Sequence, residues 1–223
     1  VTTLFPGSLQ NSSTSAATAA DGLFATLASQ ASTSIDIALF DFDRPRVRAA
    51  LLAATARGVG VRAVGDDEDA LNPSYAPFYQ SMTGAGITVV NDTSSSLMHN
   101  KFAVSDDAVT WTGSANFSNN AFVRNGENVV VITSTVVAQI YGAEFDEMVG
   151  GKFHGAKSDN TAHSATVAGS PVEVAFAPTD GVEARMIAAL DSVRAHAPML
   201  ALALLLGGGA LALVTPHGRA SWA

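Results

Sequence analysis

Leu-Met-His-Asn-Lys-Phe-Ala-Val-Ser-Asp at residues 97–106, followed by Gly-Ser-Ala-Asn at 113–116, is the most informative stretch of this chain. His99 and Lys101 are two positions apart, and alternate side chains of a β-strand point to the same face. An imidazole and an ammonium would therefore project side by side, while the apolar side chains of Met98, Phe102 and Val104 line the opposite face. The stretch predicts a strand that presents a nucleophile beside a group able to bind an anion.

The residues that follow predict a β-hairpin. Ser-Asp-Asp at 105–107 has the composition of a tight turn, and residues 108–112 would form the return strand. That strand would bring Gly113, Ser114 and Asn116 next to the start of the first strand. Gly113 allows close approach of the backbone, and the other two side chains offer neutral hydrogen-bond donors for phosphate oxygens.

Chance is a poor explanation for this spacing. If each specified residue occurs at roughly one position in twenty, a match to H-x-K-x4-D arises in about three per cent of chains of this length. Requiring G-S-x-N shortly afterwards lowers that chance by a factor on the order of eight thousand. We therefore interpret the combination as one functional motif.

The motif resembles the signature of the phospholipase D superfamily, in which H-x-K-x4-D is followed by G-S-x-N and later by a Glu-Asn pair. The matching residues here are His99, Lys101, Asp106, Gly113, Ser114, Asn116, Glu127 and Asn128. Residues 34–42 and 53–62 also look like the first strand and the first helix-to-strand turn of that family. The resemblance covers residues 1–155.

The resemblance implies a metal-independent phosphodiesterase without a cofactor, which hydrolyses phospholipid phosphodiesters through a phosphohistidine on His99. By the same resemblance the catalytic residues are His99, Lys101, Asn116 and Glu127, and the substrate-binding residues are Ser114, Gly113 and Asn128. Lys101 and Asn116 would bind the phosphate, and Glu127 would orient a catalytic histidine. Asp106 is interpreted as a structural residue of the hairpin turn rather than as a catalytic acid.

This chemistry needs a second titratable group. A neutral imidazole must attack while another, protonated group releases the leaving oxygen, and one histidine cannot do both at the same instant. The resemblance implies two facing motifs, in one chain or across a homodimer, and this sequence holds one complete copy. A homodimer would complete the site. The alternative is a half-site that binds phosphate-containing ligands without turnover.

The chain divides into three expected segments. Residues 1–155 would form the catalytic domain, residues 156–170 a linker, and residues 171–223 an incomplete second repeat, because a strand, a helix and an apolar run there parallel the start of the chain. The apolar run at 199–214 has sixteen residues interrupted by three glycines, fewer than the roughly twenty that span a bilayer. We expect two strands joined by a glycine turn and no transmembrane anchor.

Strand and helix periodicity alternate along the chain. They predict strands at 35–42, 60–65, 87–90 and 128–133, and helices at 45–57, 75–83 and 136–149. We therefore expect an α/β fold in which a mixed β-sheet is flanked by helices on both faces, a phospholipase D-like α-β-α sandwich.

Composition bears on the substrate. The net charge is −8, from 12 basic and 20 acidic residues, and nucleic-acid binding draws on Lys and Arg. A phospholipid is therefore favoured over nucleic acid as the phosphodiester substrate, with an endonuclease-like activity as the alternative because G-S-x-N-F-S also occurs in the nuclease-like branch. The absence of cysteine excludes disulfides and thiolate metal sites. A Ser/Thr/Ala-rich stretch at 10–20 favours a secreted or periplasmic bacterial protein, with a cytoplasmic location left open.

Other polar residues receive simpler interpretations. The acidic run at 66–69 is expected to be a solvated loop, since it lacks the spaced ligands of a calcium site. The arginines between residues 44 and 48 suit a solvated helix face at least as well as a guide for an anionic substrate. No metal role is assigned to the isolated histidines His154, His163, His196 and His217.

Overall fold

The structure, a computed structural model, describes residues 1–4, 14–196, 204–207 and 210–214. Its main strands are β1 (Thr2–Leu4), β2 (Ser34–Leu39), β3 (Gly60–Gly65), β4 (Thr88–Asn91), β5 (Phe102–Ser105), β6 (Val109–Gly113) and β7 (Val129–Thr133). They form one sheet in the order β1-β7-β6-β5-β2-β3-β4. The helices around it are α1 (Thr14–Gln30), α2 (Pro45–Ala56), α3 (Asp67–Leu71), α4 (Ala76–Gly84), α5 (Asn119–Val123) and α6 (Thr135–Val149).

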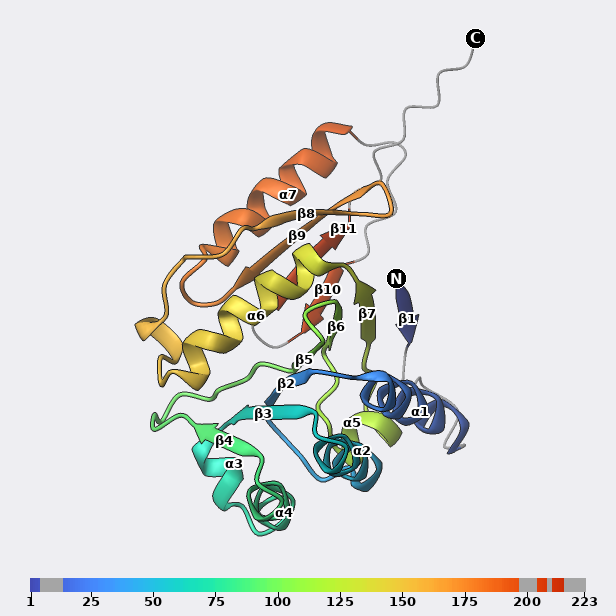
Figure 1. Ribbon diagram of the computed structural model, residues 1–223. Helices are drawn as coiled ribbons and strands as arrows, with labels where there is room; N and C mark the ends of the chain where they lie inside the picture. Colours follow the sequence, from blue (N-terminus) through green and yellow to red (C-terminus); the bar gives the residue numbers. More distant parts are fainter. Residues whose placement is uncertain (5–13, 197–203, 208–209, 215–223) are drawn as a thin grey trace.

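The sheet is mixed. β2, β3 and β4 run parallel, whereas β5, β6, β7 and β1 join through antiparallel pairings. Helices connect the parallel strands, as parallel neighbours require. The helices α1, α2 and α4 cover one face of the sheet and α6 covers the other (Figure 1). The expected α/β sandwich with a mixed sheet between helices is confirmed.

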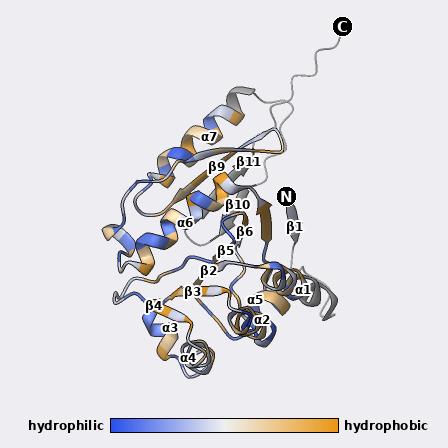
Figure 2. Cartoon of the chain, viewed as in Figure 1, coloured by the Kyte–Doolittle hydropathy of each residue, from blue (hydrophilic) through white to orange (hydrophobic). Residues whose placement is uncertain are grey.

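Strand side chains alternate between two hydrophobic cores. In β2, Ile35 and Ile37 belong to the core beneath α1 and α2, whereas Ala38 belongs to the core beneath α6. Val129 and Val130 of β7 divide in the same way. Because both faces are covered, β7 is apolar from Val129 to Ile132, and Figure 2 shows it in orange.

The predicted hairpin at 105–107 is confirmed, since β5 and β6 pair antiparallel around it. Its two aspartates have φ angles of 52° and 51°, in the left-handed region that Asp tolerates better than most residues. The first strand of this hairpin is shorter than expected. The last residue of β2 that pairs with β5 is Ala38, opposite Phe102. His99 and Lys101 therefore lie in the segment before β5 and not within a strand.

One edge of the sheet collects the polar segments. β2 and β6 end at this edge, and β5 and β7 begin there, because these neighbours are antiparallel. A bridge between Phe42 and Phe117 joins the loop after β2 to the loop after β6. The backbone N–H of Asn119 also donates to Asp43 at 2.6 Å. The topology thus brings the motif segments together from distant parts of the sequence.

The acidic run at 66–69 is not the solvated loop expected from the sequence. Asp66 is 1% exposed and caps α3 by accepting a hydrogen bond from the N–H of Asp69 at 3.2 Å. Its second oxygen accepts from the N–H of Met98 at 2.9 Å. A carboxylate at a helix N-terminus satisfies N–H groups that otherwise lack partners. Asp66 therefore also anchors the segment that carries His99.

A second sheet follows α6. Its strands are β8 (Ser164–Val167), β9 (Ser170–Phe176), β10 (Leu204–Gly207) and β11 (Ala210–Val214), in the order β10-β11-β9-β8, and α7 (Val182–His196) follows β9 (Figure 1). β8 falls inside residues 156–170, so part of the expected linker is a strand paired with β9. Phe176 of β9 shares a core with Phe145 of α6. The division at residues 155 and 171 stays a prediction.

The apolar run at 199–214 forms the two strands expected of it, as far as it is described, because β10 and β11 pair antiparallel. Residues 199–203 and 208–209 lie outside the described residues. Among the helices of the described ranges, none combines the length and the apolar character that crossing a bilayer demands.

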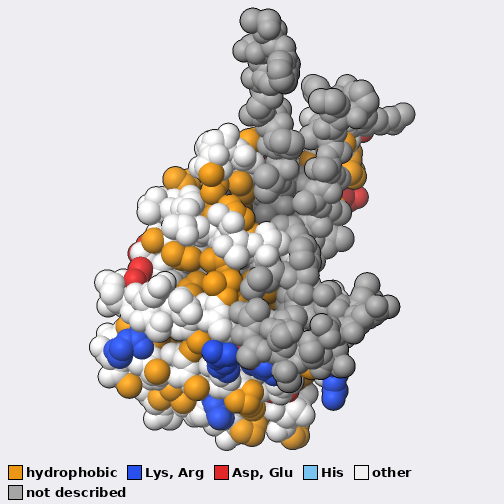
Figure 3. All heavy atoms as spheres, turned by 90° about the vertical axis from the view of Figure 1, so that its right-hand side faces the viewer, with side chains coloured by type: hydrophobic (Ala, Val, Ile, Leu, Met, Phe, Trp, Pro, Cys, Tyr) orange, Lys and Arg blue, Asp and Glu red, His pale blue; other side chains and the backbone are white. Residues whose placement is uncertain are grey.

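The arginines at the start of α2 make contacts within the fold. Arg44 forms an ion pair with Asp21 at 2.6 Å, and the guanidinium of Arg48 lies 4.6 Å from the centre of the Phe78 ring. Figure 3 shows the side of the molecule that lies on the right in Figure 1, and the Lys and Arg side chains visible there gather in the lower half, at the level of α1 and α2. Structural contacts therefore account for both Arg44 and Arg48.

Asp106 ties the hairpin turn to the start of β2. Its carboxylate accepts hydrogen bonds from the backbone N–H groups of Ser32, Thr33 and Ser34 at 2.8 to 3.2 Å. The hydroxyls of Ser32 and Thr33 donate to it as well. Burial alone would raise the pKa of Asp106, but these donors lower it well below its usual range. Asp106 thus holds the end of the hairpin that is remote from His99.

Replacing this carboxylate should destabilise the protein. We expect Asp106→Asn to lower the free energy of unfolding by about 2 kcal/mol at pH 7, because charge-assisted hydrogen bonds are lost while the left-handed backbone remains acceptable. A lowered pKa stabilises the fold above the unfolded-state pKa near 4, so the difference should shrink as the pH falls below it. Urea denaturation at several pH values measures this. Asp107→Asn at the exposed neighbouring turn position is the control, and equal effects of both substitutions would contradict the assignment.

Candidate functional site

His99 and Lys101 lie side by side against one aromatic ring. The ring centres of His99 and Phe40 are 4.7 Å apart, and the Lys101 Nζ lies 5.0 Å from the centre of the same Phe40 ring. Nζ also donates to the carbonyl oxygen of His99 at 2.7 Å. Phe40 follows β2 directly, so the end of β2 fixes both groups. The expected juxtaposition of imidazole and ammonium is present, although the two residues precede the strand.

Lys101 is a buried cation. It is 5% exposed, and within the described part of the chain it has no ion pair shorter than 4.0 Å. Burial lowers the pKa of Lys101 to about 8, although the carboxylates of Asp41, Glu127 and Asp69 oppose this shift. An ammonium near several carboxylates, but directly paired with none of these residues, is well suited to attract a phosphate.

His99 is more exposed than Lys101, and its imidazole is kept neutral near pH 7. Burial lowers the pKa of His99, and the positive charge of Lys101 lowers it further, while Asp41 and Asp66 act in the opposite direction. A neutral imidazole has a lone pair that can attack an electrophile. His99 and Lys101 therefore differ in protonation: a neutral nucleophile lies beside a charged anion-binding group.

Asn116 reaches the same site from the loop after β6. Its amide nitrogen donates to Asp41 at 2.8 Å. Asp41 in turn acts electrostatically on both His99 and Lys101. An amide nitrogen carries two hydrogens, so Asn116 can donate to Asp41 and to a ligand oxygen at once. Sequence reasoning gave Asp41 no role and placed it within the strand expected at 35–42, whereas in the structure it lies two residues beyond the end of β2.

Ser114 connects Glu127 and Asn128. Its hydroxyl donates to Glu127 at 2.5 Å and accepts from the backbone N–H of Asn128 at 3.0 Å and from its side-chain amide at 3.2 Å. A Cβ on Gly113 would lie 2.3 Å from the carbonyl oxygen of Asn128, and φ is +147° there, so glycine is required for this approach. The Glu127 carboxylate bonds Ser114 and Asn125 in the described residues, and its expected role in orienting a histidine stays a prediction.

A carboxyl pair adjoins the site. Burial raises the pKa of Asp69 to about 7, and the charges of Asp41 and Asp66 add to the effect. Asp69 also carries a buried oxygen without a hydrogen-bond partner among the described residues. A carboxyl with this pKa is protonated about half of the time at pH 7, so Asp41 and Asp69 together carry less than two negative charges next to Lys101.

A pocket of about 220 Å³ adjoins His99. Its walls are mainly apolar, with Leu97, Met98 and Phe153 among them, and Asn100 and Lys157 also line it. A larger cavity, of about 790 Å³, lies elsewhere, between β9 and α7. Of the motif residues, His99 lines the smaller pocket, whereas Lys101, Ser114 and Asn116 are not among its lining residues.

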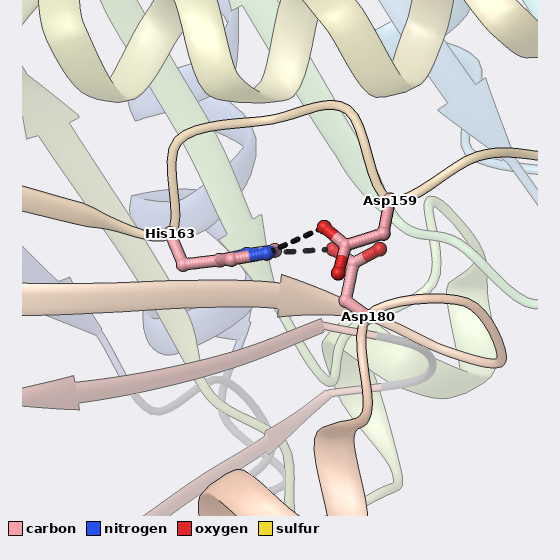
Figure 4. A group of neighbouring side chains, drawn as sticks. All are labelled: Asp159, His163 and Asp180. Carbon is pink, nitrogen blue, oxygen red and sulfur yellow. Dashed lines mark hydrogen bonds and ion pairs between the residues drawn. The ribbon is translucent and has the colours of Figure 1, made fainter.

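Two groups of possible metal ligands occur among the described residues. Asp66, Asp67 and Asp92 form one, and Asp159, His163 and Asp180 form the other. Figure 4 shows the imidazole of His163 pointing toward the carboxylates of Asp159 and Asp180, although sequence reasoning saw no partner at ligand spacing for it. Both ring nitrogens of His163 already make hydrogen bonds, to Asp159 at 2.6 Å and to the carbonyl of Val174 at 3.1 Å.

These contacts give the second group a structural explanation. Asp180 accepts from the N–H of Phe176 at 2.8 Å and from the hydroxyl of Thr179 at 3.0 Å. The group therefore links the end of β9 to the turn before α7. Asp66 and Asp92 are likewise engaged, since Asp92 accepts from the N–H of Asp67 at 3.0 Å and contacts His154 at 2.6 Å.

Comparisons with known proteins identify a family model and several relatives that match part of this chain. A family model described as "Cardiolipin synthase, PLD-like domain" matches residues 24–149. The mitochondrial cardiolipin hydrolase of Xenopus laevis is 36% identical over 118 residues, which is 53% of this chain and 55% of that protein. Phospholipase D of Rickettsia prowazekii is 33% identical over 112 residues, 50% of this chain and 54% of that protein.

Solved structures show the same relationship. Nuc from Salmonella typhimurium, a phospholipase D family member, aligns with a TM-score of 0.56 at 27% sequence identity, covering 58% of this chain and 86% of that chain. This chain spans about half the length of the curated relatives named above. The family match ends at Val149, so the second sheet lies beyond it.

Anion binding should depend on the protonation of Lys101. With a pKa of about 8, the ammonium fraction falls about tenfold between pH 7 and pH 9, so the affinity for tungstate, a dianion over this range, should fall about tenfold as well. Isothermal titration calorimetry measures the affinity. Lys101→Arg should remove most of this decrease, because a guanidinium stays charged, and the loss of the Asp69 proton accounts for the remainder, while Lys152→Arg should keep the full decrease. A wild-type affinity that is equal at both pH values would exclude Lys101 as the anion-binding group.

Proposed function

Because this chain belongs to the phospholipase D-like family, whose model matches residues 24–149, we propose that it hydrolyses phosphodiesters with the imidazole of His99 as the nucleophile. The observation that carries the proposal is the shared packing of His99 and Lys101 on Phe40, which sets a nucleophile beside a buried ammonium. Asn116, on the loop after β6, donates a further hydrogen bond to the phosphate in this proposal.

The reaction proceeds in two displacements. A ring nitrogen of His99 attacks phosphorus, the bond to the leaving oxygen breaks, and that oxygen takes a proton from a second acid. Water then gives a proton to the second acid, which the first step left deprotonated, and attacks the phosphohistidine, so that the bond between nitrogen and phosphorus breaks, the second product leaves and the imidazole is restored. Lys101 and Asn116 hold the non-bridging oxygens and stabilise the negative charge that they carry through both displacements. Ser114, Gly113 and Asn128 shape the loop that faces the phosphate.

The second acid is supplied by self-association in this proposal. His99 is kept neutral for attack, so a different imidazole must deliver the proton to the leaving group. The sequence holds one complete motif, and a homodimer places the His99 of a second copy opposite the first. Activity per molecule then increases with protein concentration until the dimer is fully formed.

We propose a phospholipid as the substrate. Two relatives carry the names cardiolipin hydrolase and phospholipase D, which supports this class. The net charge of −8 disfavours a long polyanion such as nucleic acid. The apolar pocket beside His99 also suits a phosphodiester attached to an apolar body.

A single assay tests nucleophile and substrate together. With EDTA present, wild-type protein should hydrolyse vesicles of phosphatidylcholine containing cardiolipin, and His99→Ala should reduce the rate by a factor on the order of a thousand or more. The matched control is His196→Ala at the last position of α7, which should keep the wild-type rate. Product release is followed by mass spectrometry over a range of protein concentrations.

Each arm has its own contradicting result. Turnover that survives His99→Ala, or that disappears with EDTA, overturns the proposed mechanism. Faster cleavage of single-stranded DNA than of vesicles overturns the substrate class and leaves the nucleophile intact. A rate per molecule that stays constant from nanomolar to high micromolar protein overturns the dimer.

A further inference from the structure

Asn100, the residue between His99 and Lys101, belongs to a buried polar network with Glu144 and Lys157. The side-chain amide of Asn100 donates to Glu144 of α6 at 3.1 Å and contacts the sulfur of Met148 at 3.4 Å. Glu144 forms an ion pair with Lys157. Asn100 is thereby fastened to α6, whereas both of its neighbours face the candidate site.

The network extends beyond the family match. Lys157 follows α6 in the chain, and its ammonium also donates to the carbonyl of Ala177 at 3.1 Å. Lys157 and Ala177 line the same pocket of about 220 Å³ as His99. The segment after Val149 therefore forms part of the wall beside the nucleophile.

The burial of this network is almost complete. Glu144 is 2% exposed, and Asn100 and Lys157 are each 7% exposed. Burial raises the pKa of Glu144, while Lys157 and Asn100 oppose the shift. Taking two charges out of water is costly, and an apolar pair of similar volume is often as stable. Stability alone is therefore a weak explanation for an ion pair at this place, whereas fixing the direction of Asn100 is a specific one.

We propose that Glu144 and Lys157 are positioning residues for catalysis, which hold Asn100 so that His99 and Lys101 project together into the site. The proposal rests on the proposed phosphodiesterase function. Neither residue touches the reacting atoms. Both act through Asn100, and Lys157 makes the segment after α6 a necessary part of the catalytic unit.

The test compares Lys157→Met with a matched control. Lys152→Met removes another lysine of the same segment that pairs with a glutamate of α6, but it leaves Asn100 untouched. We expect Lys157→Met to lower kcat by tenfold to about a hundredfold at a temperature well below unfolding, with a smaller rise in KM, because the misplaced nucleophile loses rate and the misplaced Lys101 loses part of the affinity. Lys152→Met should keep both constants.

A double-mutant cycle separates positioning from general destabilisation. Asn100→Ala and Lys157→Met should not be additive in kcat, since both remove the same restraint. A kcat for Lys157→Met within twofold of wild type, or additive losses, would overturn the proposal. If Lys157→Met does not fold, Glu144→Met replaces it in the same cycle, because it removes the oxygen that accepts the hydrogen bond from Asn100.

The nuclear magnetic resonance signals of the His99 ring give a readout independent of turnover. Release of Asn100 should change the position of the imidazole relative to Lys101 and so shift the pKa of His99, in Lys157→Met but not in Lys152→Met. If the wild type is active and the His99 titration is unchanged in Lys157→Met, the positioning role is refuted and the proposed function stands. Inactivity of the wild type on every phosphodiester would refute the proposed function, and the titration would still decide whether the network holds His99.

Discussion

The antiparallel pairing of β5 with β2 on one side and β6 on the other is the constraint on which the site depends. It places the end of β2, the start of β5 and the end of β6 at one edge of the sheet. Phe40 then lies beneath His99 and Lys101, and Asn116 reaches Asp41 from the next loop. A shift of one residue in this register would turn every strand side chain to the opposite core.

Charge is distributed unevenly within the site. Lys101 is buried near Asp41, Glu127 and Asp69 without a direct ion pair to any of them in the described residues, so its charge is attracted but not neutralised at contact. The same ammonium disfavours protonation of His99. The Lys101 ammonium thus has two effects: it attracts a phosphate, and it favours the neutral form of the neighbouring imidazole. An acidic protein can bind an anion in this way because the local field, not the net charge, acts on the ligand.

Local features of the fold could be predicted from the sequence, and long-range features could not. The hairpin at 105–107 and the strand at 60–65 were accessible because turn composition and apolar patterning are local. The buried state of Asp66 was missed because its partner Met98 lies 32 residues away. The spacing of four between Asp159 and His163 is a local signal of their contact. The contact of His163 with Asp180 could not be predicted, because the turn after β9 brings Asp180 to it.

The same distinction applies to the candidate site. The motif gave the residue types and the approximate placement of His99, Lys101 and Asn116. It did not give Asp41, or the contact of Asn100 with Glu144, because those depend on which helix packs on which face. The strand expected at residue 99 begins at Phe102, since β2 offers no pairing partner beyond Ala38.

The central claim is that His99 becomes covalently bound to phosphorus during turnover. Rapid mixing with a phosphodiester substrate, a quench at alkaline pH and intact-protein mass spectrometry test it most directly. The account predicts a transient mass increase equal to the phosphoryl part of the substrate, located at His99 by fragmentation and lost after brief acid treatment. Steady turnover with the adduct on a different residue would contradict it.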